Sequence, residues 1–179
     1  MLGIGQRFPQ YALTGVVSAD PARAFETIDS AQLAGKWQVV FFWPMDFTFV
    51  CPTEIAAFGA LTREFAERNA QLLGASVDSE YVHLAWRQAR EELRELAFPM
   101  LADVRRELSS ALGILDPEAG VAQRATFIVD LQGLIRFAYA TDLNVGRNPA
   151  EVLRVLDALQ TEELCPCNWQ PGDATLKAA

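Results

Sequence analysis

The sequence predicts an α/β fold with a central mixed β-sheet. Residues 37–43 form a near-continuous apolar run rich in β-forming residues, which is typical of a central strand buried on both faces. Segments with helical periodicity alternate with further strand-like segments, and residues 125–139 show the pattern of a β-hairpin. The order is a βαβ unit followed by a ββα unit, which favours helices packed against a single sheet.

Length and composition indicate one folded domain. The chain has 179 residues, of which 51% are hydrophobic and 21% are charged, close to the averages of globular proteins. This composition excludes disorder over most of the chain. The net charge is −8 and neither half of the chain is basic. We therefore expect neither nucleic acid nor an anionic membrane surface as a partner.

The first half of the chain alternates strand-like and helical segments. Residues 6–17 are expected to be extended or to form a hairpin, and the polar residues 20–35 are expected to form a loop. After the 37–43 strand, apolar residues recur at spacings of three and four, which predicts an amphipathic helix: Ile55, Phe58, Leu61 and Phe65. Pro52 suits the first turn of this helix. Residues 71–77 follow as a second strand.

The second half continues the alternation. Residues 80–96 form a strongly charged helical segment, and a short strand follows it. Asp103 is expected to cap a helix that ends at Gly113. After the hairpin, Asn148 is a good N-cap for the last helix because a proline follows it. An apolar stripe then continues along that helix at Val152, Val155, Leu156 and Leu159.

The segment between the 37–43 strand and the next helix carries the chemistry. It reads Pro44-Met-Asp-Phe-Thr-Phe-Val-Cys51, with Cys51 at the start of the helix. A thiol in the first turn of a helix lies near free N–H groups, which favour the nucleophilic thiolate. Thr48 can place its hydroxyl near this sulfur. Because a free cysteine is more often an ordinary buried thiol, the assignment depends on the flanking pattern.

The flanking pattern resembles the peroxiredoxin signature Pro-x-x-x-Thr/Ser-x-x-Cys, which stands here as Pro44, Thr48 and Cys51. Three further segments agree with it: the extended form Phe-Thr-Phe-Val-Cys-Pro-Thr-Glu at 47–54, the arginine-bearing strand at 124–130, and the resolving-cysteine motif at 164–169. The resemblance is to the alkyl hydroperoxide reductase C and typical two-cysteine branch. It implies a thioredoxin-like fold.

The resemblance implies roles for four residues of the pocket. Cys51 is the peroxidatic cysteine, Thr48 its hydrogen-bond partner and Pro44 the shield of the pocket. Arg124 is the pocket arginine, whose guanidinium would favour the thiolate and hold the peroxide oxygens with a fixed fork of donors. Considered without the resemblance, an isolated arginine at the start of a strand, such as Arg124, is more often a surface residue.

Glu54 and Trp86 match further family positions that support the pocket. Their own context is equally compatible with a first-turn acid and with a core residue of an amphipathic helix. His83 is the only histidine and is expected to be a partly exposed helix residue. A zinc site at Cys165 and Cys167 is disfavoured, because structural zinc needs four ligands and few other candidates remain.

The resemblance also implies roles for the C-terminal cysteines. Cys165 matches the resolving cysteine, which in this branch comes from the partner subunit of a dimer. Cys167 is a departure, since a small residue usually stands there, although some bacterial members carry three cysteines. We expect residues 1–164 to form the thioredoxin-like domain and residues 165–179 to form a tail that carries the resolving cysteine. A homodimer that assembles further into a decamer-like ring is also expected.

The implied function is a thiol-dependent peroxidase that reduces hydrogen peroxide and organic hydroperoxides. The route is a Cys51 sulfenic acid and an intersubunit disulfide with Cys165, which a dithiol reductant protein then reduces: a thioredoxin-like protein or a dedicated alkyl hydroperoxide reductase partner. No metal, flavin or haem cofactor is implied. The alternative is a redox-switched, chaperone-like ring assembly, which an assay of peroxide consumption would distinguish. Cysteine-based hydrolysis is weaker, since His83 is the only candidate imidazole base.

The expected compartment is the cytoplasm. The first ten residues lack a basic segment followed by an apolar one, and the longest apolar run is far too short to span a bilayer. Three cysteines, an odd number, do not make a structural disulfide framework, and the absence of a Cys-x-x-Cys motif disfavours a thioredoxin-type reductase.

Overall fold

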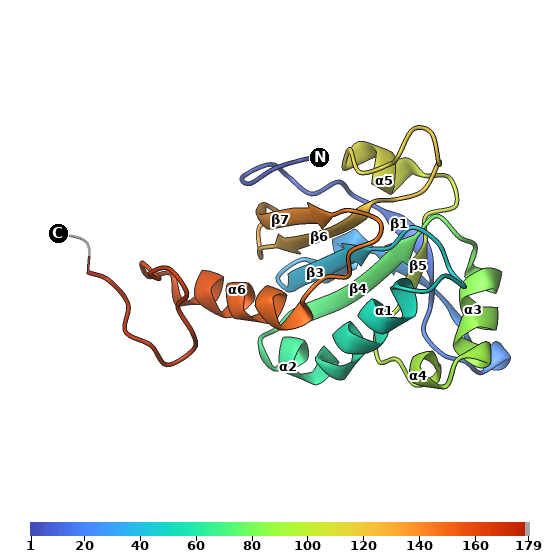
Figure 1. The fold of residues 1–179 in the computed structure, drawn as a ribbon, viewed down its shortest axis with the longest axis horizontal. Helices are drawn as coiled ribbons and strands as arrows, with labels where there is room; N and C mark the ends of the chain where they lie inside the picture. Colours follow the sequence, from blue (N-terminus) through green and yellow to red (C-terminus); the bar gives the residue numbers. More distant parts are fainter. Residues whose placement is uncertain (178–179) are drawn as a thin grey trace.

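A seven-stranded mixed sheet lies at the centre of the computed structural model, which describes residues 1–177 (Figure 1). The strand order is β2-β1-β5-β4-β3-β6-β7. The three central strands pair in parallel: β3 (Trp37–Phe42), β4 (Ala70–Ser76) and β5 (Met100–Ala102). The outer strands pair antiparallel: β1 (Ala12–Val16), β2 (Phe25–Asp29), β6 (Arg124–Val129) and β7 (Ile135–Thr141). The expectation of a central mixed sheet is confirmed.

β3 is the buried central strand that the apolar run predicts. Its side chains alternate between two apolar cores, as the two-residue period of a strand requires. Val39 and Phe41 belong to one core, whereas Val40 and Phe42 belong to the other, and all four are fully buried. Because β3 ends inside the molecule, the loop that follows it begins from a rigid base.

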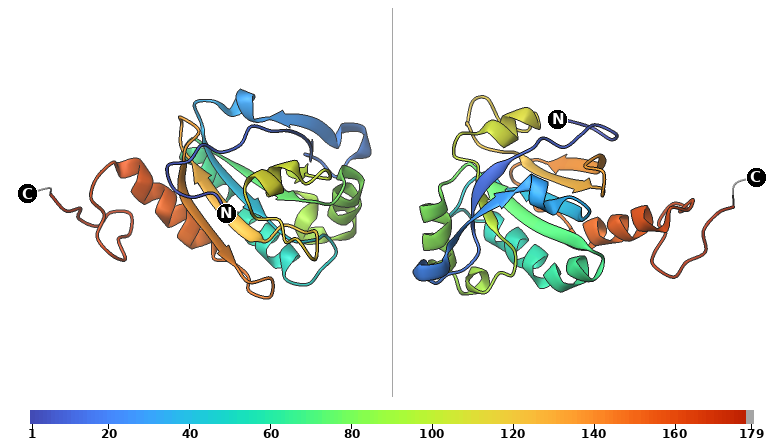
Figure 2. Two further views of the ribbon diagram at one scale, coloured as in Figure 1. Left: turned by 90° about the horizontal axis from the view of Figure 1, so that it is seen from above. Right: turned by 180° about the vertical axis from the view of Figure 1, so that it is seen from behind.

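The helices lie on the two faces of the sheet, with most of them on one side (Figures 1 and 2). That face is covered by α1 (Cys51–Ala60), α2 (Thr62–Glu67), α3 (Glu80–Ala89), α4 (Glu91–Arg94) and α6 (Pro149–Thr161). The opposite face is covered by α5 (Glu107–Ala111) together with the N-terminal segment around Phe8 and Tyr11. Two short 3-10 helices, Pro21–Arg23 and Ser30–Leu33, flank β2.

Helix ends follow the capping residues that the sequence contains. The carboxylate of Asp103 accepts hydrogen bonds from the backbone N–H groups of Leu108 and Ser109 at the start of α5. The side chain of Asn148 caps α6 by accepting from the N–H groups of Ala150 and Glu151. The predicted Asn148 cap is thus confirmed, and it fixes where the chain turns from the pocket into α6. Asp103 bonds the first turn of α5 from outside the N-cap position, which is Arg106, and this helix is shorter than expected because it begins at Glu107 and ends at Ala111.

Three expectations about the elements are wrong. The helix expected through Ile55, Phe58, Leu61 and Phe65 is interrupted at Leu61, between α1 and α2. Residues 20–35, expected to form a loop, contain β2, whose five residues pair with β1 along its whole length. The helical segment 80–96 is interrupted at Arg90, which takes an extended conformation with φ −119° and ψ 121° between α3 and α4. As a separate finding, no helix within residues 1–177 is long and apolar enough to cross a membrane.

Candidate active site

Cys51 occupies the first position of α1, and its side chain is fully buried. The preceding loop, residues 43–50, connects the end of β3 to this helix. Pro52 stands in the first turn, where its missing N–H donor leaves no bond unmade, and no side chain caps the start of the helix. The sulfur therefore lies at the positive end of α1, next to backbone N–H groups that favour a thiolate.

Thr48 is the nearest side-chain partner of the sulfur. Its Oγ1 lies 2.9 Å from Sγ of Cys51 and also 2.9 Å from the carbonyl oxygen of Met45. A hydroxyl carries only one hydrogen, so it can donate to one of these two groups at a time. When Cys51 is a thiol, its S–H can donate to Oγ1 while the hydroxyl donates to Met45. When Cys51 is a thiolate, the hydroxyl can turn and donate to the sulfur.

Arg124 approaches the same sulfur from β6. Its Nη1 lies 3.3 Å from Sγ of Cys51, and its Nε donates to the carbonyl oxygen of Leu143 at 2.7 Å. The side chain is 4% exposed. The reading of Arg124 as a surface arginine is therefore wrong. Within residues 1–177 no protein group bonds Nη2, which leaves that nitrogen able to donate to a bound molecule.

Glu54 joins Arg124 to a second arginine that the sequence reasoning missed. Oε2 of Glu54 accepts from Nη1 of Arg124 at 2.6 Å, and Oε1 accepts from Nε of Arg147 at 2.7 Å. The guanidinium of Arg147 is buried over the ring of Phe41, 5.5 Å from its centroid, and over the ring of Phe58. Its position directly before the predicted N-cap of α6 is the only signal that the sequence offered.

Charge balance in this cluster leaves the sulfur facing a net positive charge. Burial alone would raise the pKa of Glu54, but hydrogen bonds from Arg147 and the charges of Arg147 and Arg124 hold it below its usual value. The carboxylate is thus ionised at neutral pH and compensates one of the two guanidinium groups. The remaining positive charge favours a thiolate on Cys51.

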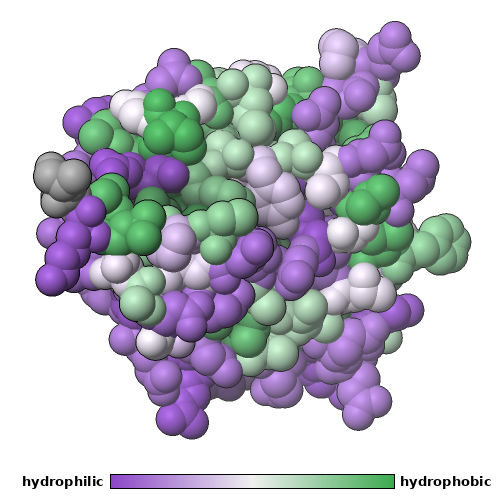
Figure 3. Space-filling view, turned by 60° about the vertical axis from the view of Figure 1, so that its left-hand side comes forward, coloured by the Kyte–Doolittle hydropathy of each residue, from purple (hydrophilic) through white to green (hydrophobic). Residues whose placement is uncertain are grey.

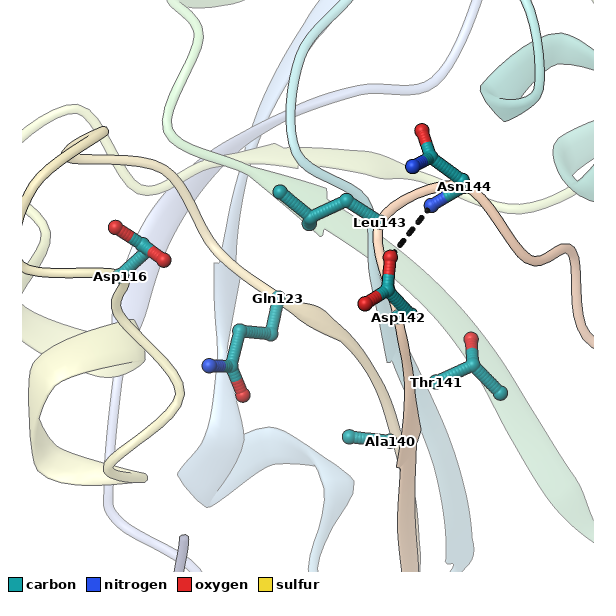
Figure 4. A pocket seen from close by; sticks show the side chains of 7 residues that line it. All are labelled: Asp116, Gln123, Ala140, Thr141, Asp142, Leu143 and Asn144. Carbon is teal, nitrogen blue, oxygen red and sulfur yellow. Dashed lines mark hydrogen bonds between the residues drawn. The ribbon is translucent and has the colours of Figure 1, made fainter.

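Pro44 lies in the wall of a small pocket that adjoins the sulfur. This pocket has a volume of about 230 Å³ and is lined by Pro44, Thr48, Phe49, Val50, Arg124, Leu143 and Asn144. A larger pocket of about 540 Å³ shares the last two of these residues and continues along the end of β7 (Figure 4). Its polar lining includes Asp116, Gln123 and Asp142, and the carboxylate of Asp142 accepts from the backbone N–H of Asn144 at 3.2 Å.

Two residues of α3 lie behind the 43–50 loop. Trp86 is buried and its ring lies 5.8 Å from that of Phe47, so it packs against the loop. His83, expected to be partly exposed, is fully buried and bonds the carboxylate of Asp46, so that expectation is wrong. Among residues 1–177, no cluster of histidine, cysteine and acidic side chains is arranged to hold a metal ion.

The C-terminal cysteines lie beyond the far end of α6. Cys165 is half-buried, with its sulfur 3.4 Å from Oγ1 of Thr161, whereas Cys167 is exposed. α6 begins beside the Glu54 cluster and runs away from it for 13 residues, about 20 Å at 1.5 Å per residue (Figure 1). The structure therefore brings together Thr48, Arg124 and Glu54 around Cys51, but it does not bring either C-terminal cysteine of the same chain there.

Comparisons with known proteins agree with this geometry. The AhpC/TSA family matches residues 4–138, and the C-terminal domain of 1-Cys peroxiredoxin matches residues 158–179. Alkyl hydroperoxide reductase C of Mycobacterium tuberculosis is 55% identical over 99% of this chain and 95% of that protein. Peroxiredoxin-2 of Bos taurus is 43% identical over 97% of this chain and 89% of its own length.

Solved structures show the same likeness. Mycobacterium tuberculosis AhpC superposes with a TM-score of 0.87 at 54% identity, covering 95% of this chain and 99% of that one. The reduced 2-Cys peroxiredoxin of Plasmodium vivax superposes with a TM-score of 0.91 at 34% identity, covering 99% of this chain and 94% of that one.

The thioredoxin-like sheet and the buried cysteine at the start of α1 define an enzyme of the thiol peroxidase class. The chain belongs to the AhpC/TSA family of peroxiredoxins, within the typical two-cysteine branch that includes alkyl hydroperoxide reductase C. The expected family, fold and enzyme class are confirmed. The second match begins inside α6, so the boundary expected at residue 165 stays a prediction.

Proposed function

We propose that the chain reduces hydrogen peroxide and organic hydroperoxides at Cys51 and that Cys165 of a second copy resolves the product. One observation carries the first part of this proposal: Thr48 and Arg124 converge on a buried sulfur at the start of α1, at 2.9 and 3.3 Å. Pro44 closes one wall of the pocket in front of them. These groups suit a reaction in which negative charge moves from sulfur to a leaving oxygen.

The peroxide step is a displacement at oxygen. The Cys51 thiolate attacks the terminal oxygen of the hydroperoxide, so that an S–O bond forms and the O–O bond breaks. The leaving oxygen takes a proton and departs as water or an alcohol, while the sulfur is oxidised to a sulfenic acid. Thr48 and Nη2 of Arg124 would hold the two oxygens in line with the sulfur, since both can donate hydrogen bonds to developing negative charge.

The resolving step requires another chain. Cys165 attacks the sulfenic sulfur, a disulfide forms, and the sulfenic oxygen leaves as water. Since α6 carries Cys165 about 20 Å from the cluster of its own chain, a thiol from a second copy is the simpler source. β7 is an edge strand of the sheet, and apolar surface is exposed on the side of the molecule that carries the end of α6 (Figure 3). Leu164 and Leu176, both beyond the end of α6 in the chain, are exposed. Both features support a homodimer, and assembly of dimers into a decamer-like ring completes this part of the proposal.

A dithiol protein would return the enzyme to its reduced state by thiol–disulfide exchange. Its dithiol attacks the disulfide, releases both cysteines as thiols and becomes oxidised itself. Cys167 is exposed two residues beyond Cys165, which suits a relay toward this reductant. A reducing compartment such as the cytoplasm fits this cycle, because Cys51 must be reduced before each turnover.

The test is consumption of hydrogen peroxide and of an organic hydroperoxide with dithiothreitol as the reductant. The wild-type chain should consume both at catalytic protein concentrations, whereas Cys51→Ser should be inactive and folded, because a hydroxyl of ordinary acidity cannot supply the nucleophile. Cys167→Ser is the matched control and should retain the oxidation of Cys51. Turnover by Cys51→Ser above the uncatalysed rate would overturn the mechanism.

A further inference from the structure

The loop that carries Thr48 is held in a strained conformation. Phe47 takes a φ of 57°, the left-handed region that bulky residues rarely adopt. Such a conformation persists only where the surroundings hold it in place, and it tends to occur at functional sites. Phe47 is 56% exposed, so burial of its own ring does not account for the restraint. The restraint must come from the residues next to it.

α3 supplies contacts to two consecutive residues of this loop. His83 bonds the carboxylate of Asp46, and Trp86 packs against the ring of Phe47. His83 and Trp86 are three residues apart, so they lie on the same face of α3. The loop is thus fixed at the residue before the strained position and touched at the strained position itself.

His83 and Asp46 form the stronger of these contacts. Nδ1 of His83 lies 2.6 Å from Oδ2 of Asp46, and both side chains are fully buried. Nε2 of His83 faces the carbonyl oxygen of Leu101 at 3.2 Å, and a carbonyl can only accept, so Nε2 carries a hydrogen. A second hydrogen must lie between Nδ1 and Oδ2. The pair is therefore a short bond that holds one shared proton, either as imidazolium and carboxylate or as imidazole and carboxylic acid.

Asp46 is also held from the strand side. Its Oδ1 accepts from Nε1 of Trp43 at 2.7 Å, and its backbone N–H donates to Oδ2 of Asp78 at 2.9 Å. Asp78 is the other titratable group that faces the pair, and Ser76 donates to the same Oδ2. Burial raises the pKa of Asp46, although the bond and charge of His83 oppose this effect. Asp46 therefore anchors the loop: its carboxylate bonds α3 and the residue after β3, and its backbone N–H bonds the segment after β4.

Asp46 directly follows Met45, whose carbonyl oxygen competes with the Cys51 sulfur for the hydrogen bond donated by Thr48. The carbonyl of Met45 accepts from Thr48 at 2.9 Å, and the peptide bond after that carbonyl leads directly to Asp46. Displacement of Asp46 would therefore displace the Met45 carbonyl and allow Thr48 to move away from the sulfur. Small displacements of a positioned group change reaction rates strongly.

We propose that His83 is a positioning residue of the peroxidase site, which acts through Asp46 and Met45 to keep the Thr48 hydroxyl aligned with Cys51. This proposal rests on the function proposed above and deepens it. His83 touches neither the sulfur nor the pocket, so its loss changes the reaction only by releasing the loop. His83 positions the loop through its Nδ1 bond to Asp46, and its Nε2 bond to Leu101 does not contribute to this effect.

Two substitutions separate these bonds. The amide nitrogen of an asparagine falls close to Nδ1 of histidine, whereas that of a glutamine falls close to Nε2. His83→Asn should keep the bond to Asp46, and His83→Gln should keep only the bond to Leu101. The readouts are the rate of Cys51 oxidation by hydrogen peroxide, the pH midpoint of Cys51 alkylation, and the urea midpoint of unfolding.

We expect His83→Gln to oxidise about ten-fold more slowly and to shift the alkylation midpoint to higher pH, with His83→Asn close to wild type. Equal losses in both variants, or a loss in neither, would overturn the proposal. If His83→Gln does not fold, His83→Leu decides, because it removes the Nδ1 bond to Asp46 and fills the buried site with an apolar side chain. Slower oxidation by His83→Leu than by His83→Asn supports the proposal, and equal rates in these two variants overturn it. Failure of the proposed function itself would appear separately, as a wild-type chain whose Cys51 does not react with peroxide.

Discussion

Arg124 and Glu54 form a buried ion pair beside the reactive sulfur, with Nη1 of Arg124 2.6 Å from Oε2 of Glu54. The same Nη1 lies 3.3 Å from Sγ of Cys51. Glu54 follows Cys51 by about one turn of α1, so the helix that presents the thiol also presents the carboxylate that orients the arginine. A substitution of any one of these three residues therefore changes the hydrogen bonds and the electrostatic surroundings of the other two.

Removal of the Arg124 guanidinium should slow the peroxide step and disfavour the thiolate. Arg124→Ala takes away a positive charge and the donors that would hold the peroxide oxygens, and the loss of one such donor slows a reaction by about 10²-fold. The pH midpoint of Cys51 alkylation should move upward at the same time. Stopped-flow oxidation and a pH series of alkylation rates measure the two effects. Arg136→Ala is the control, because that half-exposed arginine pairs with Asp130 only at 3.5 Å. An unchanged rate and midpoint in Arg124→Ala would assign that arginine a structural role alone.

Neutralisation of Glu54 should destabilise the fold in a pH-dependent way. Glu54→Gln leaves two buried guanidinium groups without their carboxylate, and breaking a buried pair from one side lowers the free energy of unfolding by about 3–5 kcal/mol. Arginine contacts hold the pKa of Glu54 below its usual value in the folded protein. The stabilisation is therefore fully present above the usual pKa and is lost as pH falls through the lower, folded value.

Urea unfolding at neutral and at acidic pH tests this linkage. The difference between wild type and Glu54→Gln should be large at pH 7 and should narrow as pH falls. Glu151→Gln is the matched control: that exposed carboxylate pairs with Arg154 at 2.7 Å, so its loss should change stability by less than about 1 kcal/mol. If the difference in unfolding free energy between wild type and Glu54→Gln stays constant with pH, the charge of Glu54 is not what stabilises the fold.

The sequence predicted the parts of the fold that carry a strong periodic or capping signal. The buried strand β3, the β6–β7 hairpin and the Asn148 cap of α6 are of this kind. β2 was missed because it is an edge strand whose side chains are mostly exposed, so it shows no apolar alternation. The break at Arg90 carries neither proline nor glycine, so no local signal marks it.

The residues of the candidate site also fall into two groups, those that local sequence spacing predicts and those that it does not. Cys51 and Thr48 lie three residues apart at a helix start, so local spacing alone brings them together. Arg147 and His83 depend on partners 93 and 37 residues away, and no local pattern reports such contacts. His83 lies in a strongly charged helical segment, where only Trp86, three residues further on, indicates that this face of α3 is buried.

Cys165 should be the main resolving thiol and Cys167 a reserve or a relay. The sulfur of Cys165 lies against the end of α6, whereas Cys167 is exposed, so the two thiols have different surroundings. Non-reducing gels of the peroxide-treated variants test the assignment. Cys165→Ser should lose most of the disulfide-linked dimer band or form it slowly, and Cys167→Ser should keep it. The reverse pattern would exchange the two roles.

Resistance to overoxidation follows from how little holds the first turn of α1. A sulfenic acid at Cys51 either forms the disulfide or meets a second peroxide and becomes a sulfinic acid. No side chain caps the start of α1, and within residues 162–177 no helix follows α6 that could pack over it. Glu54 anchors the helix through its two arginines, so unwinding is confined to residues 51–53.

Weakly held segments open at low free-energy cost, so this short turn should unwind and release Cys51 faster than peroxide can oxidise it again. We therefore expect disulfide formation to outrun sulfinic acid formation until peroxide is in large excess over the protein. Mass spectrometry of Cys51 after turnover at graded peroxide concentrations measures the ratio of the two products. Cys165→Ser is the control, because without the resolving thiol sulfinic acid should accumulate at low peroxide. Abundant sulfinic acid at low peroxide in the wild-type chain, with active reductant present, would show that the first turn of α1 is restrained after all.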